Sequence, residues 1–361
     1  MKIKIAILFG GKSAEHEVSL KSATNIFNAV DKTKFEPILL GNDTNGDWYH
    51  NIDYVSKNVD LTKLDYFAHS SNVFLFNSNG QIQIIEKETN QVLDFFEVAF
   101  PMIHGTFGED GTLQGLLKSL NIPFVGPDVL GSAIAMDKDI TKRLLRDANI
   151  PIADFYTLQK HNLNEYTFEE IENKLKLPLF IKPANAGSSV GVSKVTCKNT
   201  FIAALSEAFK FDNKILIEEA INGKEVECAI LGNEIIKASV IGEIIPTKDF
   251  YSYDAKYLSL NGAKMKIPAD IDEVTSRKIK EQAIKAFKTI CCEGMARVDF
   301  FLREDNTFVL NEINTLPGFT EISMYPKLWE HSGVEYKSLI TELINLAVKR
   351  NKRDNDLLTE M

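Results

Sequence analysis

A lysine beside a loop of small residues indicates a phosphate-binding site between residues 180 and 195. The stretch reads FIKPANAGSSVGVSKV, in which an extended apolar run ends at Lys182 and the loop that follows contains Ser188 and Ser189. A positive charge next to free backbone N–H groups is suited to phosphate. The order differs from the common loop GxxxxGKS/T, because there the glycines precede the lysine. The sequence therefore indicates a phosphate site of another kind.

A second group of polar residues lies on two expected strands near the end of the chain. Arg297 and Asp299 are two apart in ARVDF, and Glu312 and Asn314 are two apart in LNEIN, so each pair shares one face of its strand. REDNT between them reads as a hairpin turn, which makes the two faces neighbours. Oxygen ligands of this kind suit Mg²⁺ bridged by phosphates, although a structural Arg–Asp pair is the alternative. Gly318 in NTLPGF favours function, because it would place a bare amide near the arginine, as an oxyanion site needs.

Together the two groups predict a nucleotide held between two sheets. Lys182 and its loop would cover a triphosphate whose Mg²⁺ is held by the acidic pair. The strand ILIEEAI would run past the adenine, with Glu218 reading the base and Glu225 taking the ribose hydroxyls. Lysines from one sheet and carboxylates from another are an ATP-grasp arrangement.

The elements that would position these residues alternate between strands and helices. IKIAILFGG reads as a buried strand and a glycine turn, and the helix after it has an apolar face that includes Ala23, Ile26 and Phe27. FEPILLG follows, which completes a strand–helix–strand unit. GGKSAE does not spell GxGxxG, so a dinucleotide site is only weakly indicated. Residues 43–95 read as hairpin strands added to this first domain, which closes near residue 127.

Two further regions follow. A helix that starts at Ser132 carries MDKDITKRLLRDANI and is expected to end at Pro151. PLFIKP and KILIEEAI flank the loop of Lys182, with a helix at about 200–209 between them. The third region begins near Asn222 and ends in an amphipathic helix over about 335–350, with a frayed tail after it.

Composition excludes several classes of protein. A chain of 361 residues with 44% hydrophobic content can fill two or three domains. The basic residues are scattered, which does not favour nucleic-acid binding, and no apolar run is long enough to span a bilayer. The start resembles a short signal peptide, but Lys4 interrupts the apolar run, so we expect a buried strand instead. Four cysteines without a C-x-x-C pair predict reduced, buried thiols in a cytoplasmic protein.

Seven motifs in order resemble those of the D-alanine–D-alanine ligases. They are GGKSAEHEVS, HGTFGEDGTLQG, MDKDITK, FIKPANAGSSVGVSKV, YSYDAKY, ARVDFFL and NEINTLPGFT, and they leave only 43–95 unplaced. The resemblance implies an α/β fold of three-domain ATP-grasp architecture. Its domains would be an N-terminal Rossmann-like βαβ domain at 1–127, a central domain at 128–221 and a metal-binding domain at 222–361. It also implies a cytoplasmic homodimer that makes a peptidoglycan precursor.

The resemblance further implies how two D-alanines would be joined. The carboxylate of the first would attack ATP and become an acyl phosphate, which the amine of the second would attack. Glu15 would hold the ammonium of the first D-alanine, with His104 close by, and would be linked to Ser188 and Tyr257. Arg297 and Gly318 would form the oxyanion hole. Ser323 and Met324 would contact the second D-alanine.

For the nucleotide, the resemblance implies ATP and two Mg²⁺ ions, which Mn²⁺ can replace. Asp299, Glu312 and Asn314 would bind the metal. The polar loop 247–262 would close as a lid over the reacting groups. The residues implied to bind ATP are Lys138, Lys182, Glu218, Glu219, Ala220, Ile221, Glu225, Lys256, Phe301 and Asn311.

Two other functions stay open at this point. An ATP-grasp ligase could join a different acid and amine, or make D-alanyl-D-serine or D-alanyl-D-lactate, and a screen of ATP consumption would discriminate. A non-enzymatic α/β binding protein would need neither Lys182 nor an acidic cluster nor a lid.

Overall fold

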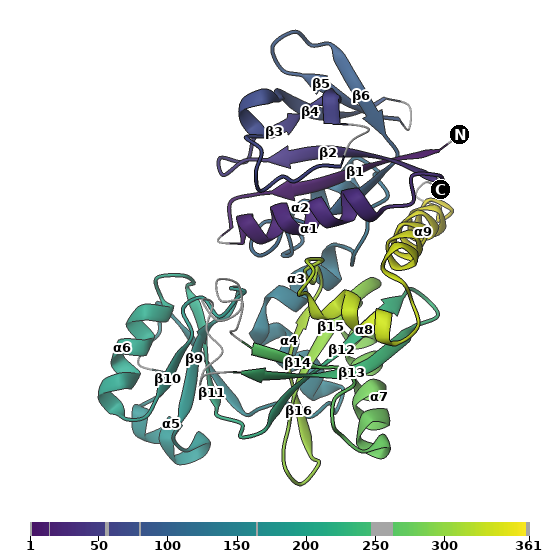
Figure 1. Ribbon diagram of the computed structural model, residues 1–361. Helices are drawn as coiled ribbons and strands as arrows, with labels where there is room; N and C mark the ends of the chain where they lie inside the picture. Colours follow the sequence, from purple (N-terminus) through teal and green to yellow (C-terminus); the bar gives the residue numbers. More distant parts are fainter. Residues whose placement is uncertain are drawn as a thin grey trace.

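In the part of the chain that the structure describes, the strands form three sheets, around which the helices pack (Figure 1). The structure is a computed structural model that describes residues 2–13, 15–54, 58–78, 81–163, 165–246 and 263–358. The strand orders are β6-β5-β4-β3-β2-β1-β7, β10-β9-β11-β8 and β14-β13-β12-β15-β16. One sheet lies within each of the ranges 1–127, 128–221 and 222–361. The boundaries between these ranges stay predictions.

The first sheet combines a parallel centre with an antiparallel extension. β1 pairs in parallel with β2 and β7, and its residues from Ile5 on are buried, as expected of a strand covered on both faces. The segment 43–95 forms strands that pair antiparallel from β2 outward, so the prediction of added hairpin strands is confirmed. The elements are β1 (Ile3–Gly10), α1 (His16–Ala29), β2 (Phe35–Asn42), β3 (Trp48–His50), β4 (Ser71–Ser78), β5 (Gln81–Glu86), β6 (Val92–Phe96), β7 (Val98–Pro101) and α2 (Thr112–Ser119), with short 3₁₀ helices at Ile52–Tyr54 and Phe67–His69.

The second sheet has one apolar and one polar face. Leu158, Ile181 and Ile217 pack against α5 and α6, which lie on the outer side of the sheet in Figure 1. Alternation along the strands puts Lys182 and Glu218 on the opposite face, where α4 lies. The elements are α3 (Val129–Met136), α4 (Lys138–Asp147), β8 (Phe155–Gln159), α5 (Phe168–Leu175), β9 (Leu179–Pro183), β10 (Ser193–Val195), α6 (Lys198–Ala208) and β11 (Lys214–Glu219).

The single helix predicted from Ser132 to Pro151 is wrong. It is divided at Asp137, whose extended backbone ends α3 and whose carboxylate accepts from the N–H groups of Asp139 and Ile140 to cap α4. α4 ends at Asp147, before the proline, because Asn149 adopts a left-handed conformation. The cap places Lys138 at the first turn of α4.

The third sheet carries the acidic hairpin. Its elements are β12 (Lys224–Gly232), β13 (Lys237–Pro246), β14 (Ala263–Lys266), α7 (Glu273–Thr289), β15 (Gly294–Leu302), β16 (Phe308–Asn314), α8 (Met324–His331) and α9 (Tyr336–Asn355). The prediction that the last helix stops near residue 350 is wrong. Arg353, in the segment expected to fray, forms ion pairs with Glu234 and Glu293, which hold the last turns.

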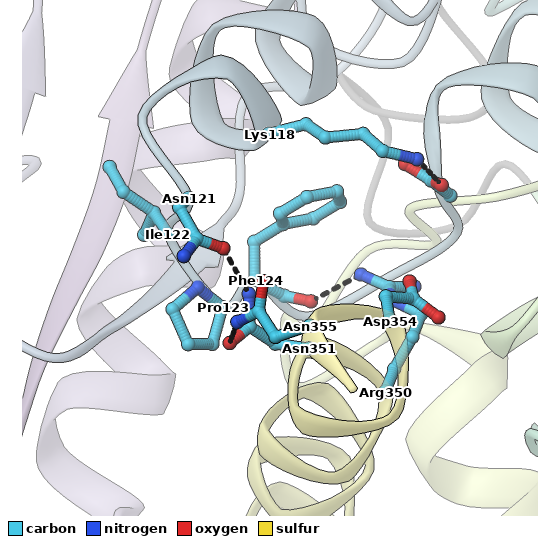
Figure 2. Close-up of a pocket in the computed structure, with 10 residues that line it drawn as sticks. Lys118, Asn121, Ile122, Pro123, Phe124, Arg350, Asn351, Asp354 and Asn355 are labelled. Atoms are coloured by element: carbon cyan, nitrogen blue, oxygen red, sulfur yellow. Dashed lines mark hydrogen bonds and ion pairs between the residues drawn. The ribbon is translucent and has the colours of Figure 1, made fainter. Parts of the chain in front are cut away.

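Helix α9 joins the C-terminal region to the first sheet. Its buried residues Leu339, Leu343 and Ala347 belong to the same core cluster as Ile5 and Phe100. Beyond this core, the buried Arg350 donates to the carbonyl oxygens of Phe124 and Gly126 and lines a pocket of about 190 Å³ (Figure 2). This pocket contains none of the predicted site residues.

Two further expectations concern cysteines and membranes. All four cysteines are free thiols, but Cys197 and Cys291 are exposed, so the prediction of buried thiols holds only for Cys228 and Cys292. Within the described residues, no helix is both long enough and apolar enough to cross a bilayer.

Candidate active site

The loop after Lys182 reaches the first sheet and contacts Glu15. Glu15 precedes α1 and is buried, yet its side chain makes no capping hydrogen bond to that helix. Its carboxylate instead accepts from the hydroxyl of Ser188. A Cβ on Gly187 would lie 3.3 Å from Glu15 Oε2, and one on Gly105 would lie 2.7 Å away. The glycines therefore allow two loops to close around this carboxylate.

The backbone of the loop is strained where it meets Glu15. Ser188 and Ser189 have φ angles of 52° and 59°, a left-handed backbone conformation that residues other than glycine rarely adopt. Such strain persists only where the surroundings impose it, and it gathers at functional sites. The contact between Ser188 and Glu15 is one such constraint.

His104 lies behind Glu15 and is held from three sides. Its Nδ1 donates to the carbonyl oxygen of Leu316 at 3.0 Å, and its Nε2 lies 3.3 Å from the hydroxyl of Ser22. Burial opposes its charged form, but the hydrogen bond and charge of Glu109 and the charge of Glu15 outweigh burial, so the pKa of His104 is raised. Burial and the neighbouring Glu15 also raise the pKa of Glu109. Glu109 was missed from the sequence, although it lies in HGTFGED.

The two predicted phosphate lysines lie at the start of α4 and near the end of β9. Lys138 Nζ donates to the carbonyl oxygen of Ala186 at 2.6 Å, so it lies under the loop that carries Ser188. Lys182 Nζ lies 2.8 Å from Glu218 Oε2. Glu218 also faces Lys142, a residue missed from the sequence, whose Nζ lies 3.4 Å from Oε1. Lys142 lies one helical turn after Lys138 and so on the same face of α4, which could have indicated it as a site residue.

The acidic hairpin brings the two predicted polar faces together. Arg297 lies opposite Asn314, and Asp299 lies opposite Glu312. The guanidinium donates to both oxygens of Asp299, at 2.8 and 2.7 Å, and Asn314 Nδ2 donates to Asp299 at 2.9 Å. Glu227, on β12, lies 3.0 Å from the guanidinium. Glu227 was not predicted as a site residue. Its charge within the otherwise apolar run VECAIL could have indicated it.

The charges of this cluster favour added cations. Burial opposes the charged form of Arg297, but Asp299 and Glu227 outweigh it and raise its pKa, so the guanidinium stays charged. The carboxylates of Glu227, Asp299 and Glu312 all act on this guanidinium, and Glu312 also interacts electrostatically with Lys142. The residues described contain no group of three or more His, Cys, Asp or Glu able to hold a metal by themselves. Two carboxylates and an amide oxygen fit Mg²⁺ whose remaining ligands are phosphate and water oxygens.

The segment after β16 is fixed by helix α1. Phe319 N–H donates to Ser22 Oγ at 3.2 Å, and Asn25 Nδ2 donates to the carbonyl oxygen of Phe319 at 3.1 Å. A Cβ on Gly318 would lie 2.8 Å from Ser323 Oγ, so the two residues are in contact. The bonds on both sides of Gly318, including that from His104 to Leu316, restrict where its amide can lie.

Ser323 and Met324 begin helix α8. Ser323 Oγ accepts from the N–H of Thr320 at 2.9 Å and forms a second hydrogen bond, 2.8 Å long, with the hydroxyl of Thr320. The side chain of Met324 is only 4% exposed and packs in the core with Leu328. Little of the thioether is therefore open to a substrate.

The residues predicted to bind adenine and ribose lie where the chain passes from β11 of the second sheet to β12 of the third sheet. The side-chain carboxylate of Glu219 accepts from the N–H of Asp154 at 2.9 Å, and the N–H of Ala220 donates to the carbonyl oxygen of Pro178. Glu225 lies directly opposite Phe301. Asn311 is the extra residue of a bulge between β15 and β16, which re-aims its side chain. Ile221 follows Ala220 in the connecting segment.

Lys256, Tyr257 and the rest of the predicted lid 247–262 lie outside the described residues. The structure thus brings together Glu15, His104 and Ser188 in one group and Arg297, Asp299, Glu312 and Asn314 in another. A third group, Lys182 and Glu218, lies on the polar face of the second sheet.

Comparison with known proteins gives consistent matches over almost the whole chain. Family models described as D-ala D-ala ligase N-terminus and D-ala D-ala ligase C-terminus match residues 4–127 and 144–345. A D-alanine--D-alanine ligase of Oceanobacillus iheyensis is 52% identical over 99% of this chain and 98% of that one. D-alanine--D-alanine ligase A of Escherichia coli K12 is 51% identical, with full coverage of both chains.

Solved structures of similar ligases match over nearly the same length of the chain. The D-alanine-D-alanine ligase from Coxiella burnetii matches with a TM-score of 0.83 and 37% identity, covering 98% of this chain and 96% of that one. The VanG D-Ala:D-Ser ligase from Enterococcus faecalis matches with a TM-score of 0.85 and 36% identity, covering 96% and 100%.

Proposed function

This chain belongs to the D-alanine–D-alanine ligase family and has its ATP-grasp fold, and we propose here how its residues carry out the family's reaction. The enzyme joins two D-alanine molecules to D-alanyl-D-alanine at the expense of ATP, for peptidoglycan precursor synthesis. The carboxylate of the first D-alanine attacks the γ-phosphate of ATP, the bond to the β-phosphate breaks, and ADP leaves as an acyl phosphate forms. The amine of the second attacks that carbonyl carbon, and phosphate leaves.

The first D-alanine binds at Glu15. The carboxylate of Glu15 accepts from the ammonium group, while Ser188 keeps it in place and His104 lies beside it. The single observation that carries this proposal is the hydrogen bond from Ser188 to Glu15. It joins the loop after the phosphate lysine to the carboxylate that selects an amino acid.

Lysines surround the phosphates of ATP. Lys138 and Lys182 bind the α- and β-phosphates, and Lys256 reaches the γ-phosphate. Positive charge offsets the crowding of phosphoryl oxygens as the carboxylate attacks. Tyr257 is assigned to the exclusion of water, because an acyl phosphate would be lost if water entered.

Asp299, Glu312 and Asn314 hold Mg²⁺, with Mn²⁺ as a substitute. The gathering of Asp299, Glu312 and Asn314 on one side of the hairpin supports this proposal. When bound, the metal would neutralise phosphate charge. Because Asp299 also accepts from Arg297, the metal ligand and the guanidinium are fixed relative to each other.

Arg297 and the amide of Gly318 stabilise the oxyanion of the tetrahedral intermediate. The guanidinium is held by Asp299 and Glu227, and the amide by the bonds on either side of it, so both donors are fixed before the charge develops. Ser323 binds the carboxylate of the second D-alanine through its hydroxyl. Because the side chain of Met324 is buried, we expect Met324 to contact the second D-alanine through its backbone N–H group.

The strand edge from Glu218 to Ile221 binds adenine, and Glu225 binds the ribose. Phe301 lies opposite Glu225 on the neighbouring strand, where it can cover the nucleotide from the third sheet. Glu219 and Ala220 contribute backbone groups, and Asn311 adds a polar side chain beside the metal ligands.

Three broader features are proposals with less direct support. The domain boundaries at 127 and 221 fall between the three sheets. A homodimer is supported by an exposed apolar surface on β4 and β6, formed by Phe74, Phe76, Val92 and Phe95. A cytoplasmic location is supported by the use of ATP.

Phosphate release with D-alanine and Mg-ATP, followed by mass analysis of the product, tests the proposed function. We expect one phosphate per D-alanyl-D-alanine. In competition, D-serine and D-lactate should give minor products near neutral pH. A main product containing either of them would instead favour the D-Ala–D-Ser or D-Ala–D-lactate alternative. The Glu15→Gln variant should raise the KM of the first D-alanine far more than that of ATP.

A further inference from the structure

Lys142 is a buried lysine that the reaction as described does not use. It lies on α4, is 1% exposed, and its Nζ has no hydrogen-bond partner among the described residues. The nearest carboxylate oxygen, Glu218 Oε1, is 3.4 Å away. A buried ammonium group is costly unless something compensates it, so its presence needs an explanation.

A carboxylate shared between two lysines offsets part of this cost, although burial still lowers the pKa of Lys142. Glu218 faces Lys182 with one oxygen and Lys142 with the other, and the side chains of Lys142, Glu218 and Lys182 are 1%, 6% and 11% exposed. Burial would raise the pKa of Glu218, but the two ammonium groups outweigh burial and lower it. The carboxylate is thus ionised because two cations face it.

The two lysines differ in what a nucleotide would do to them. Lys182 lies near the end of β9 and is assigned to phosphate, so bound phosphates would draw its charge away from Glu218. Lys142 lies deeper, on α4, with its Nζ 5.9 Å from the centre of the Phe155 ring. It can therefore stay with Glu218 when ATP binds.

We propose that Lys142 is a positioning residue for the nucleotide, an inference that rests on the proposed function. It keeps Glu218 ionised and in place while Lys182 holds phosphate, and so makes the site select adenine. The exocyclic amino group of adenine donates a hydrogen bond, whereas the oxo group of guanine or hypoxanthine only accepts one. An ionised carboxylate accepts from the first and repels the second.

The charged groups around Glu218 limit what else could control it. Lys142 faces it from α4 and Lys182 from β9, while β8 contributes the uncharged Phe155. Arg146, also on α4, lies 6.0 Å from the Phe155 ring. Glu312, on the third sheet, interacts electrostatically with Lys142. Lys142 is thus the cation next to Glu218 that is not assigned to phosphate.

The test compares Lys142→Met with wild type, using ATP and inosine triphosphate at pH 6 and pH 8.5. In the variant we expect the KM for ATP to rise about tenfold at pH 6 and to recover at pH 8.5, because Glu218 now takes up a proton. At saturating ATP, kcat should fall less than about threefold. The preference for ATP over inosine triphosphate should shrink at pH 6 only in this variant, since a protonated Glu218 can donate to an oxo group.

The control is Lys174→Met, in which the lysine lies on α5 and faces Tyr156, the neighbour of Phe155, on the other side of the sheet. It should match wild type throughout. Lys142→Arg, which retains the charge, should restore the selectivity. The inference is overturned if Lys142→Met has the wild-type KM for ATP, if the loss is equal at both pH values, or if kcat falls instead.

Thermal melting checks that the variants are folded. If Lys142→Met does not fold, Lys142→Arg decides: unchanged base selectivity supports the inference, and selectivity lost in a folded protein with the charge retained overturns it. Failure of wild type to make D-alanyl-D-alanine would instead refute the proposed function.

Discussion

Replacing Ser188 by alanine tests the contact between the phosphate loop and the first substrate's carboxylate. The substitution removes the hydroxyl that donates to Glu15. A hydrogen bond to a charged group contributes about 1.5–3 kcal/mol, so the KM of the first D-alanine should rise about 10- to 150-fold. The KM of ATP should change much less, because Lys138 and Lys182 are untouched.

A second substitution separates the hydroxyl from the strained backbone. Ser188 has a φ of 52°, which glycine adopts without strain. Ser188→Gly should therefore lose the same affinity for D-alanine but be more stable than Ser188→Ala in thermal melting. If the two variants differ in KM while their stabilities agree, the hydroxyl is not the cause.

The double-mutant cycle with Glu15→Gln gives the decisive number. Steady-state kinetics of the four proteins should yield a coupling of at least about 1.5 kcal/mol between the two side chains. A coupling below about 0.5 kcal/mol would refute the reasoning, because the two groups would then act independently on the substrate.

The remaining predictions address the metal, the second substrate and the buried histidine. Glu312→Gln should raise the Mg²⁺ concentration for half-maximal rate by about 10- to 100-fold with an unchanged melting temperature, and an unchanged Mg²⁺ titration would exclude Glu312 as a ligand. Gly318→Ala should raise the KM of the second D-alanine in a folded protein, since its Cβ would lie 2.8 Å from Ser323 Oγ and the Ser323 hydroxyl would have to move; an unchanged KM would contradict this. The raised pKa of His104 means that the stability from its charged form is complete below its ordinary value of 6.5 and is lost as the pH rises through the folded value. Glu109→Gln should lower the pKa of His104 in an NMR titration and weaken this pH dependence, and an unshifted titration would show that the carboxylate does not act on it.

The two polar faces of the acidic hairpin could be predicted from the sequence because their geometry is local. Strand residues two apart share a face, so spacing predicts that Arg297 lies beside Asp299 and Glu312 beside Asn314. That these two faces meet depends on the bulge at Asn311, which shifts the register by one residue and was not predicted. The antiparallel extension over 43–95 followed from the same alternation. The contact between Ser188 and Glu15 could not be derived in this way, since 173 residues separate them. It was expected only through resemblance to the family.

The residues that were missed depend on packing between elements. Lys142 could be recognised as buried only once α4 was placed against the polar face of the second sheet. Glu227 belongs to the acidic group because β12 pairs with β15. The end of α9 depends on ion pairs of Arg353 with Glu234 and Glu293, which lie far away in the sequence.

The isotope content of the released phosphate tests the central claim most directly. D-Alanine labelled with ¹⁸O in both carboxylate oxygens is incubated with the enzyme and Mg-ATP in unlabelled water. If the first carboxylate attacks the γ-phosphate, one ¹⁸O atom must leave with each phosphate, and D-alanyl-D-alanine must retain one ¹⁸O in its new amide. Unlabelled phosphate released together with the dipeptide would contradict an acyl phosphate at this site.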